Sequence, residues 1–469
     1  MTDAGLYIGG AWRDTSERFD VRDPATGLRV GTAAVASETD VRDAVAAAAS
    51  APRLTAAERA RILRQVARDV EANVDEFAAL IRAECGKPIS AARGEAARAV
   101  DTLLLAAEGA RHLAGVQVPL DAVAVGEGLT GFTIRDPRGI VGAITPFNFP
   151  LNLVCHKIAP ALAAGCPVVL KPSERTPLTA ARLVRSFEAA GLPAGLLNLV
   201  TGDPTLIVGM LASDDRVEVL SFTGSAAVGW ELKARSPRKH HVLELGSNTA
   251  MVVMGSADIG KAVAAAVTAG FSNSGQACVP LQRVYVDGAV FEEFTDRLAA
   301  AAAAVPTGDP DDPATVVGPL ITRAAASRIH SWITAAVTRG GAVRAGGGIE
   351  GNLLQPTVVA DPPADSELVC EEAFGPVISV TPVDGLDDAL AHVNASRFGL
   401  NTSIFTSDIG EALTYARQAQ AGTVLVNVAP SFRADNMPYG GVKDSGQGRE
   451  GVPSAIEDLT VPRLVVLAS

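Results

Sequence analysis

A regular alternation of short apolar segments and helix-like segments runs through the chain from residue 138 onward. The apolar segments have strand length, and patterns of helical spacing separate them at about 152–164, 176–190 and 204–212. The strand-like segments cover residues 140–144, 168–170, 196–200 and 217–222. Because parallel strands need crossover connections, such alternation is typical of a parallel sheet covered by helices. The sequence therefore predicts an α/β fold.

A second alternating region follows the first. It opens with an apolar segment at 251–254 and an Ala-rich helical pattern from about 257, and it continues through a helix near 322–339. Further strands are predicted near 376–381 and 423–428. A chain of 469 residues fits two or three domains. Two α/β domains with an intervening cleft are the simplest account.

The segment 54–113 precedes this alternation and has apolar residues at helical spacing. Thr55 and Glu58 have the spacing of a helix-capping box, and Gly-Lys-Pro at 86–88 is predicted to divide the segment into two helices. Residues 115–136 instead show short apolar runs interrupted by glycine, which favours short strands with turns.

Charge and cysteine content exclude several classes of protein. The net charge of −12 argues against a nucleic-acid partner, which requires a basic surface. The five cysteines are scattered without a Cys-x-x-Cys pair, so neither a zinc site, another metal site nor a disulfide framework is predicted. No apolar run reaches the roughly 18 residues that span a bilayer, and no signal peptide is read. We expect a reduced, cytoplasmic enzyme without a membrane partner.

Three residues have the chemistry of covalent acyl transfer. Cys278 follows a Gly- and Ser-rich segment, whereas Glu244 and Asn148 lie upstream in short apolar motifs. A thiol, a carboxylate and an amide can act as nucleophile, base for water and oxyanion donor. Each also has a structural interpretation: a buried small hydrophobe for Cys278, a turn for Asn148 and a half-buried strand carboxylate for Glu244.

Two strand ends have the composition of a nucleotide site. Phe-Thr-Gly-Ser at 222–225 joins a strand to a helical pattern, where glycine lets backbone amides approach a phosphate. Lys-Pro-Ser-Glu at 171–174 ends another strand with a carboxylate that can accept hydrogen bonds from ribose hydroxyls and repel a 2′-phosphate. Taken alone, the first is more often a structural turn and the second could be a solvated charged turn.

Seven motifs occur in an order and spacing that resemble the NAD(P)-dependent aldehyde dehydrogenase superfamily. The resemblance extends from Tyr-Ile-Gly-Gly-Ala-Trp at 7–12 to the end of the chain. The motifs lie at 146–150 (Pro-Phe-Asn-Phe-Pro), 171–174, 222–225, 243–246 (Leu-Glu-Leu-Gly), 275–278 (Gly-Gln-Ala-Cys), 371–376 (Glu-Glu-Ala-Phe-Gly-Pro) and 438–446. Each motif is modestly specific, whereas seven in register are highly specific.

The resemblance implies an aldehyde-dehydrogenase-like α/β fold with three parts. A discontinuous Rossmann-type NAD-binding domain is expected at 1–117 and 137–245, and an α/β catalytic domain at 246–450. A small β oligomerisation arm is expected at 118–136 and 451–469. Because exposed strand edges need a partner, the resemblance also implies a homodimer or homotetramer.

The resemblance further implies a reaction. Cys278 would attack the carbonyl carbon of an aldehyde substrate, and the Asn148 amide with the Cys278 backbone N–H would hold the oxyanion. After hydride transfer to the nicotinamide, Glu244 would activate water to hydrolyse the thioester. Lys157 matches a position that assists proton relay, although it could be an ordinary surface lysine.

NAD is the implied cofactor, with NADP not excluded. Lys171 and Glu174 are assigned to the adenosine ribose, Gly224 and Ser225 to the pyrophosphate, and Glu372 and Phe374 to the nicotinamide, although Glu372 could also be a solvated acid. The remaining positions implied to bind the cofactor are Thr145, Pro146, Phe147, Ser173, Gly202, Val228 and Leu245.

Departures from the family pattern surround the nucleophile and leave the substrate open. Ser247 stands where a second glycine is usual, Val279 precedes Pro280 where a small hydroxyl residue is common, and Phe147 replaces a frequent Trp. Ser247 and the segment from Arg433 resemble branches that act on small hydroxy-, phospho- or sulfo-aldehydes. Arg433 could anchor an anionic tail, or it could be a surface or subunit-interface residue.

Three other functions remain as alternatives. Cys278, Asn148 and Glu244 alone would support thiol-dependent acyl transfer or ester hydrolysis without redox chemistry. A CoA-acylating aldehyde dehydrogenase would release the acyl group to CoA, but the presence of Glu244 favours hydrolysis. The intact nucleophile, base and amide argue against a catalytically idle binding protein.

Overall fold

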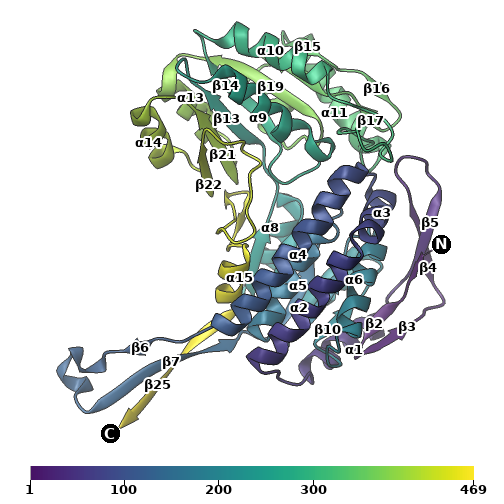
Figure 1. Ribbon diagram of the computed structural model, residues 1–469, viewed down its shortest axis with the longest axis vertical. Helices are drawn as coiled ribbons and strands as arrows, with labels where there is room; N and C mark the ends of the chain where they lie inside the picture. The colour runs from purple at the N-terminus through teal and green to yellow at the C-terminus, as the bar shows by residue number, and fades with distance from the viewer. Residues whose placement is uncertain (1, 469) are drawn as a thin grey trace.

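Two helix-covered sheets form two lobes, and a narrow arm projects from the first (Figure 1). The computed structural model describes residues 2–468. Both sheets are mostly parallel, so the predicted α/β class is confirmed. The predicted domain boundaries remain a prediction.

The first lobe is built on an eight-stranded sheet of order β24-β12-β11-β8-β9-β10-β2-β3. Its parallel centre comprises β8 (Ile140–Ile144), β9 (Val168–Lys171), β10 (Leu197–Leu199), β11 (Val217–Thr223) and β12 (His240–Glu244). Antiparallel edges are β2 (Leu6–Ile8), β3 (Ala11–Arg13) and β24 (Gly446–Gln447). β8 matches its predicted segment, β9 and β11 contain theirs, and β10 lies within the predicted 196–200. The sequence analysis did not assign β12.

Helices cover both faces of this sheet, because alternate strand residues point to opposite sides. Val141 and Ala143 of β8 belong to the core under α2, α4, α5 and α6, whereas Ile140 and Ile144 face α1, α7 and α8. The helices are α1 (Glu38–Ala49), α2 (Ala56–Ala72), α4 (Ile89–His112), α5 (Asn152–Ala164), α6 (Pro177–Ala189), α7 (Pro204–Ser213) and α8 (Ala226–Arg235).

The second lobe has a seven-stranded sheet of order β15-β18-β19-β14-β13-β21-β22. Its strands are β13 (Thr249–Val253), β14 (Leu281–Asp287), β15 (Ala342–Ala345), β18 (Thr357–Ala360), β19 (Val377–Val383), β21 (Asn401–Phe405) and β22 (Thr423–Val426). The covering helices are α9 (Ile259–Phe271), α10 (Phe291–Ala303), α11 (Arg323–Thr338), α12 (Glu367–Cys370), α13 (Gly385–Asn394) and α14 (Ile409–Gln418).

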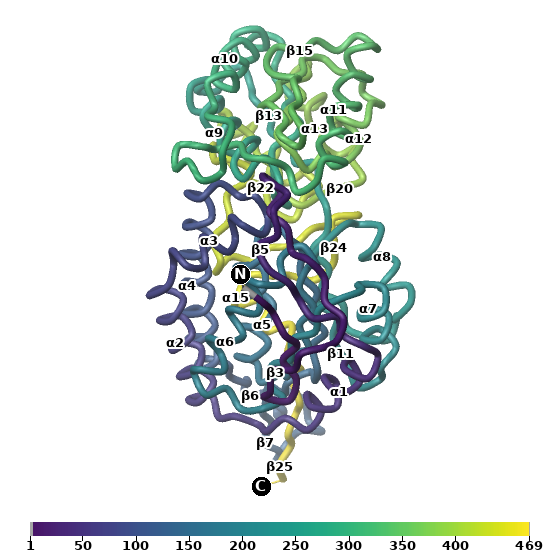
Figure 2. The backbone as a smooth tube through the Cα atoms, turned by 90° about the vertical axis from the view of Figure 1, so that its right-hand side faces the viewer, coloured from purple at the N-terminus to yellow at the C-terminus, as the bar shows by residue number. Residues whose placement is uncertain are grey.

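The arm is a three-stranded antiparallel sheet that extends away from both lobes in both views (Figure 2). It contains β6 (Gln117–Val118), β7 (Leu129–Pro137) and β25 (Thr460–Ala468). β25 pairs with β7 along its whole length, from Thr460 opposite Pro137 to Ala468 opposite Leu129. Smaller sheets pair β1 (Thr2–Ala4), β5 (Arg29–Ala34) and β4 (Arg18–Arg22), β16 (Ile349–Glu350) with β17 (Leu353–Leu354), and β20 (Phe398–Gly399) with β23 (Val442–Lys443).

The prediction of two helices over 54–113 is wrong, because three helices form there. Besides the expected break at 86–88, the chain breaks between α2 and α3 (Val74–Cys85) at Asn73. Asn73 leaves helical geometry at φ −122° and ψ 29°, and its side-chain amide donates to the Asp69 carbonyl oxygen. An asparagine that competes for a helical carbonyl ends the helix without glycine or proline. The predicted Thr55–Glu58 capping box is confirmed.

Two other segments differ from the expected strands and arm. Around Val123, two 3₁₀ turns form instead of a strand, η1 (Leu120–Ala122) and η2 (Ala124–Gly126). The expected second arm segment, 451–469, divides: α15 (Val452–Asp458) packs on α4 and α5, and only β25 enters the arm. Val452 and Ile456 are buried in the first lobe, which holds α15 there. Within residues 2–468, no helix combines the length and the apolarity needed to cross a membrane.

Candidate active site

Four chain segments meet around Cys278. Asn148 follows β8, Glu244 is the last residue of β12, Cys278 precedes β14, and Tyr439 follows β22. These segments touch through a bond from the Asn148 amide to the Gln276 carbonyl and a contact of the Cys278 thiol with Tyr439. The structure thus brings Cys278 and Asn148 together, and Glu244 is close enough for its charge to act on the Cys278 thiol.

The turn before Cys278 has an unusual backbone. Asn273 and Ser274 have φ values of 53° and 56°, and Gly275 follows at 69°. A β-carbon on Gly275 would lie 2.3 Å from the Gly375 carbonyl, so only glycine fits. Ser274 Oγ donates to the Gly318 carbonyl oxygen at 3.1 Å and accepts from the Gly318 N–H at 2.9 Å. Surrounding contacts therefore hold a conformation that non-glycine residues adopt only at a cost.

Amides form one side of the site. Asn148 Nδ2 donates to the Gln276 carbonyl oxygen at 3.0 Å, and Asn273 Nδ2 donates to the same oxygen at 2.9 Å. Asn148 is buried. Because an amide nitrogen has two hydrogens, the second hydrogen of Asn148 has no acceptor among the described residues. We refer to Asn148, Asn273 and Gln276 as the amide wall.

Charged and phenolic groups form the other side. Cys278 Sγ and Tyr439 Oη are 2.9 Å apart, and the Arg433 guanidinium lies 3.8 Å from the centroid of the Tyr439 ring. Glu450 accepts from Arg433 Nη2 at 3.2 Å and from Lys157 Nζ at 2.9 Å. Tyr439, Lys157 and Glu450 are buried and the Arg433 side chain is 8% exposed. We refer to Tyr439, Arg433, Lys157 and Glu450 as the charged wall.

Burial settles two alternatives from the sequence. Lys157 is not a surface lysine: its ammonium also donates to Ser221 Oγ at 3.0 Å inside the first lobe. Arg433 is not a surface residue either, although its Nε, also buried, forms no hydrogen bond with any described residue.

Asp435 connects the charged wall to the helices of the first lobe. It accepts from Arg98 at 2.7 Å and pairs with His156 Nε2 at 2.9 Å. Burial and the neighbouring Arg433 charge lower the pKa of His156, so the imidazole is neutral near pH 7. Although burial alone would raise the pKa of Asp435, its bonds with His156 and Arg98 lower it, and the carboxyl is ionised.

Glu244 is buried and both of its carboxylate oxygens lack a hydrogen-bond partner within the described chain. Burial raises the pKa of Glu244 well above its ordinary value, and the Glu450 charge raises it further against the opposing charges of Arg433 and Lys157. Glu450 behaves oppositely: despite its burial, Lys157 and Arg433 lower its pKa. The pKa values of two neighbouring carboxyls are thus shifted in opposite directions, which is typical of acid–base sites.

The pKa of the Cys278 thiol is raised. Burial is the main cause, and the Glu244 and Glu450 charges add to it, while the Arg433 charge and the Tyr439 hydrogen bond oppose it. Desolvation also raises the pKa values of the buried Cys85, Cys155 and Cys166, but these lie away from Arg433 and Tyr439, and Cys370 is exposed. The structural interpretation of Cys155 and Cys166 therefore stands.

The residues predicted for the adenosine end of a cofactor lie at the carboxyl ends of β9 and β11. Lys171 Nζ donates to Glu174 at 3.3 Å, and the Glu174 side chain is 48% exposed. Helix α8 begins directly after Gly224 and Ser225, and Ser225 makes no side-chain cap to its N-terminus. Free N–H groups at a helix start suit a phosphate.

The residues predicted for the nicotinamide end lie in the second lobe. Glu372 accepts from the Ser247 N–H at 2.9 Å, and a β-carbon on Gly246 would lie 2.3 Å from its carboxylate. Burial raises the pKa of Glu372 to about 7, against the opposing Ser247 bond. Phe374 and Phe147 make an edge-to-face contact with ring centroids 5.8 Å apart.

The other positions predicted for the cofactor lie along the same strand ends. Thr145 and Ser173 are buried, Leu245 is buried against Gly229, and Val228 on α8 is 47% exposed. Gly202 has φ 129°, and Pro146 precedes Phe147 after β8.

Tyr439 and Glu450 were not predicted as site residues. Both signals were present: Tyr439 lies in the Pro-Tyr-Gly-Gly motif, and Glu450 follows the Gly-Gln-Gly-Arg segment. Neither spacing reveals that Tyr439 contacts Cys278 or that Glu450 pairs with Lys157, 293 residues away.

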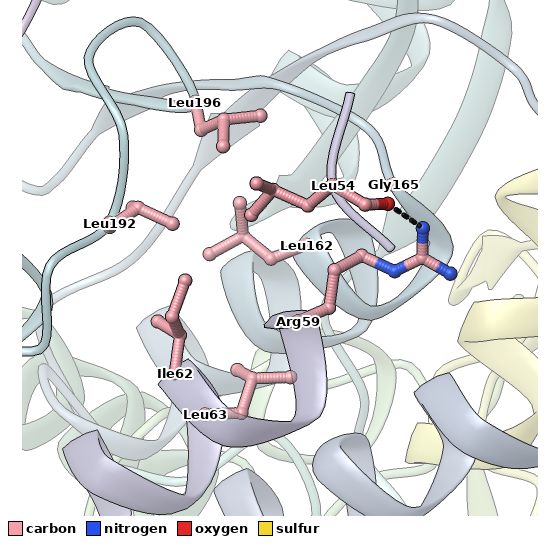
Figure 3. A pocket seen from close by; sticks show the side chains of 8 residues that line it. All are labelled: Leu54, Arg59, Ile62, Leu63, Leu162, Gly165, Leu192 and Leu196. Carbon is pink, nitrogen blue, oxygen red and sulfur yellow. Dashed lines mark hydrogen bonds between the residues drawn. The ribbon is translucent and has the colours of Figure 1, made fainter. Parts of the chain in front are cut away.

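An apolar pocket between α2 and α5 is separate from this site (Figure 3). Leucine side chains line most of it, and Arg59 at its edge donates to the Leu54 carbonyl oxygen at 2.9 Å. It shares no residue with either wall.

Comparisons with known proteins identify the relatives of this chain. The model of the aldehyde dehydrogenase family matches residues 12–465. A 3-sulfolactaldehyde dehydrogenase of Priestia aryabhattai is 39% identical over 465 residues, covering 99% of this chain and 98% of the relative. A lactaldehyde dehydrogenase of Methanococcus aeolicus is 34% identical over 470 residues, covering 98% and 99%.

Solved structures match equally well. Aldehyde dehydrogenase 21 of Physcomitrella patens, in complex with its reaction product succinate, superposes with a TM-score of 0.97 at 35% identity, covering 100% of this chain and 98% of the other. The NADP-dependent glyceraldehyde-3-phosphate dehydrogenase of Bacillus halodurans, complexed with NADP, gives 0.96 at 30% identity with full coverage of both chains.

Proposed function

Since the chain belongs to the aldehyde dehydrogenase family, whose members are NAD(P)-dependent oxidoreductases, we propose that it oxidises a small anionic aldehyde through a thioester on Cys278. The observation that carries the choice of substrate is Arg433. Its guanidinium is buried beside the Tyr439 that contacts Cys278. Its Nε is 3.9 Å from the Asp435 carboxylate and forms no hydrogen bond within residues 2–468.

The first step is addition of the Cys278 thiolate to the aldehyde carbonyl. Burial and the Glu244 and Glu450 charges raise the pKa of Cys278, and the Arg433 charge and the Tyr439 hydrogen bond oppose that rise by stabilising the thiolate. The negative charge that develops on the substrate oxygen is stabilised by the free N–H of Asn148, because this donor is already oriented by Gln276. Addition gives a thiohemiacetal.

The residues present fit a dinucleotide. Helix α8 offers uncapped N–H groups to phosphates, and the Thr145 and Thr223 hydroxyls are buried without hydrogen-bond partners in the described chain. Glu174 and Lys171 would bind the adenosine ribose, and Glu372 the ribose at the nicotinamide. When bound, NAD(P)⁺ supplies the acceptor for the hydride, which converts the thiohemiacetal to a thioester.

Glu244 then serves the hydrolytic step. Both carboxylate oxygens are free of hydrogen bonds within residues 2–468, so they are available to a water molecule. A raised pKa makes the Glu244 carboxylate a stronger base than an exposed glutamate. It takes a proton from water as the hydroxyl adds to the thioester carbonyl, and the carbon–sulfur bond then breaks. The remaining water proton passes to the Cys278 sulfur, so the carboxylate product and the thiol are released.

The buried Arg433 cation favours an anionic substrate. Its guanidinium lies against the Tyr439 ring beside Cys278, and besides Glu450 at 3.2 Å it is 3.9 Å from Asp435. A carboxylate, sulfonate or phosphate on the substrate would accept a hydrogen bond from its Nε, which forms none within residues 2–468. The named substrates of the sulfolactaldehyde and glyceraldehyde-3-phosphate relatives have such groups.

The test replaces Arg433 with Met, which keeps the length of the side chain and removes its charge. Kinetics are measured on a sulfonated or carboxylated aldehyde and on neutral lactaldehyde. Because Arg433 also affects the thiol, both substrates lose some kcat, but only the anionic one loses about 10–100-fold more in kcat/KM. Arg433→Lys is expected to restore part of this difference. Equal losses for both substrates would refute the anion anchor.

We further propose a homodimer or homotetramer in which the arm of one copy completes the sheet of another. β25 pairs only with β7 in the described sheet, and β22 pairs only with β21, so each has an open edge. Val466 and Leu464 on β25 and Val426 on β22 are exposed, as expected for edges that need a partner.

We also propose that the protein is cytoplasmic, because the described cysteines are free thiols, which fits a reducing compartment.

Sedimentation equilibrium tests this arrangement. Val466→Lys should shift the protein towards monomer, because it places a charge where β25 of one copy would pack against another copy. Val343→Lys, on the exposed edge strand β15, is the matched control and should leave the mass unchanged. A monomeric unmodified protein would contradict the proposal.

A further inference from the structure

Helices α5 and α6 begin without a capping side chain of their own. α5 follows the Asn148 loop and α6 follows the Glu174 loop, on the neighbouring strands β8 and β9. Neither Leu151 nor Thr176, their N-cap residues, forms a side-chain cap. The first N–H groups of a helix need acceptors when they are buried. Here the acceptors come from elsewhere in the chain.

Glu95 of α4 supplies the acceptor for α5. Its Oε1 accepts from the Leu151 N–H at 2.9 Å and from the Asn152 N–H at 3.1 Å. Its Oε2 is bonded to the buried ammonium of Lys87, which lies 3.8 Å from the centroid of the Phe149 ring. Glu95 and Lys87 therefore clamp the chain immediately after Asn148.

Glu84 at the end of α3 supplies the acceptor for α6. Its Oε1 accepts from the Leu178 N–H at 2.5 Å, and its Oε2 accepts from the Thr179 N–H at 2.8 Å and from the Thr179 hydroxyl. Glu84 is fully buried. It fixes the first turn of α6, which starts three residues after Glu174.

The connection between α3 and α4 contacts the loop before Cys278 through the segment at 318–319. Gly86, between Glu84 and Lys87, packs on Pro319, and a β-carbon on Gly318 would lie 3.1 Å from the Gly86 carbonyl oxygen. Gly318 in turn exchanges two hydrogen bonds with Ser274. The segment 84–95 thus contacts the residues that hold the loops of Asn148, Glu174 and Cys278 in place.

We propose that Glu84, Lys87 and Glu95, here called the α3–α4 brace, are positioning residues with separable tasks. Glu95, held by Lys87, aims the Asn148 amide at the reacting oxygen. Glu84 holds the Lys171–Glu174 loop in the geometry that accepts the cofactor ribose. The brace rests on the proposed roles of Asn148 and Glu174 and adds residues that touch neither substrate nor cofactor.

The two tasks predict opposite kinetic signatures. In Glu95→Gln, an N–H₂ group replaces one oxygen and the ion pair is lost, so Asn148 shifts and kcat falls by about 10²-fold. The Kd of NAD⁺, measured by calorimetry without aldehyde, stays within about twofold. In Glu84→Gln, the Kd of NAD⁺ rises by about tenfold, the effect of roughly one lost hydrogen bond, while kcat at saturating NAD⁺ is unchanged.

Glu76→Gln is the matched control. Glu76 also joins α3 to α6, through Arg182 at 2.9 Å, but it is exposed and away from the first turn of α6. It should change neither kcat nor Kd. If Glu95→Gln fails to fold, Lys87→Met tests the proposed positioning of Asn148 and should lower kcat alone. If Glu84→Gln fails to fold, Thr179→Val tests the proposed positioning of the Lys171–Glu174 loop and should raise the Kd of NAD⁺ alone.

Asn148→Ala and Glu174→Ala are measured alongside to separate the two proposals. If they fail to lower kcat and NAD⁺ affinity respectively, the proposed site is wrong. If they behave as expected but the Glu84 and Glu95 variants both change kcat, both change the Kd of NAD⁺, or change neither, the proposed roles of the α3–α4 brace are wrong. The proposed site is then unaffected.

Discussion

The amide wall and the charged wall enclose the same sulfur but differ in how they are stabilised. The amide wall consists of neutral side chains fixed by hydrogen bonds to backbone groups, with Asn148 and Asn273 sharing the Gln276 carbonyl oxygen. Apart from Tyr439, the charged wall consists of ionic side chains that bond chiefly to one another, as Lys157 and Arg433 do to Glu450.

This difference separates geometry from protonation. A neutral amide held by the backbone keeps its direction at any pH, which suits a donor that must meet a developing charge. Buried charges instead set each other's proton affinity, which suits a thiol and a base that change protonation during turnover. Substitutions in the amide wall should therefore change rates at all pH values, and those in the charged wall should move the pH profile.

The largest effect is expected where the walls meet. Cys278→Ala removes the nucleophile, so aldehyde oxidation should fall by on the order of 10⁴–10⁶-fold. Production of NADH from aldehyde is the measurement, and a preserved Kd for NAD⁺ would show that the fold is intact. Residual oxidation near the wild-type rate would refute covalent catalysis.

Glu244→Gln should slow turnover by about 10²–10⁴-fold, because the thioester is left without a base for water. The acylation step does not need this carboxylate, so stopped-flow measurements should show a burst of NADH that approaches one equivalent per site. Steady-state turnover at the wild-type rate would instead favour release of the acyl group to a thiol such as CoA.

Asn148→Ala should reduce kcat by about 10²–10³-fold, equally from pH 6 to pH 9, since the lost donor carries no charge. The burst itself should slow, in contrast to Glu244→Gln. If Asn148→Ala raised KM and left kcat unchanged, Asn148 would bind the substrate equally well in the ground state and the transition state. The proposed difference between the amide wall and the charged wall would then be wrong.

The smallest effect is a shift rather than a loss. The pKa of Glu244 is raised by burial and by the Glu450 charge, so kcat should rise with pH as Glu244 loses its proton. Glu450→Gln removes that negative charge, lowers the pKa of Glu244 and moves the acidic limb of the kcat profile to lower pH. An unmoved limb in this variant would show that another group controls deacylation.

Sequence patterns predicted the α/β elements well because each depends on local periodicity. The strands at 140–144 and 217–222 and the helix at 152–164 lie where the pattern places them. The break at Asn73 escaped notice because a side-chain bond to Asp69 makes it, not a glycine or proline. The packing of α15 on α4 escaped for a different reason: its apolar residues fit a core or an interface equally well.

The sequence by itself determined the chemical parts: a thiol, an amide and a carboxylate in motifs whose order is recognisable along the chain. Only the tertiary structure decided their surroundings, including the Tyr439 contact with Cys278, the Lys157–Glu450 pair and the carboxylates Glu84 and Glu95 beneath two loops. The reason is physical. Motifs record which groups are present, whereas proton affinity and direction depend on burial and on partners up to several hundred residues away.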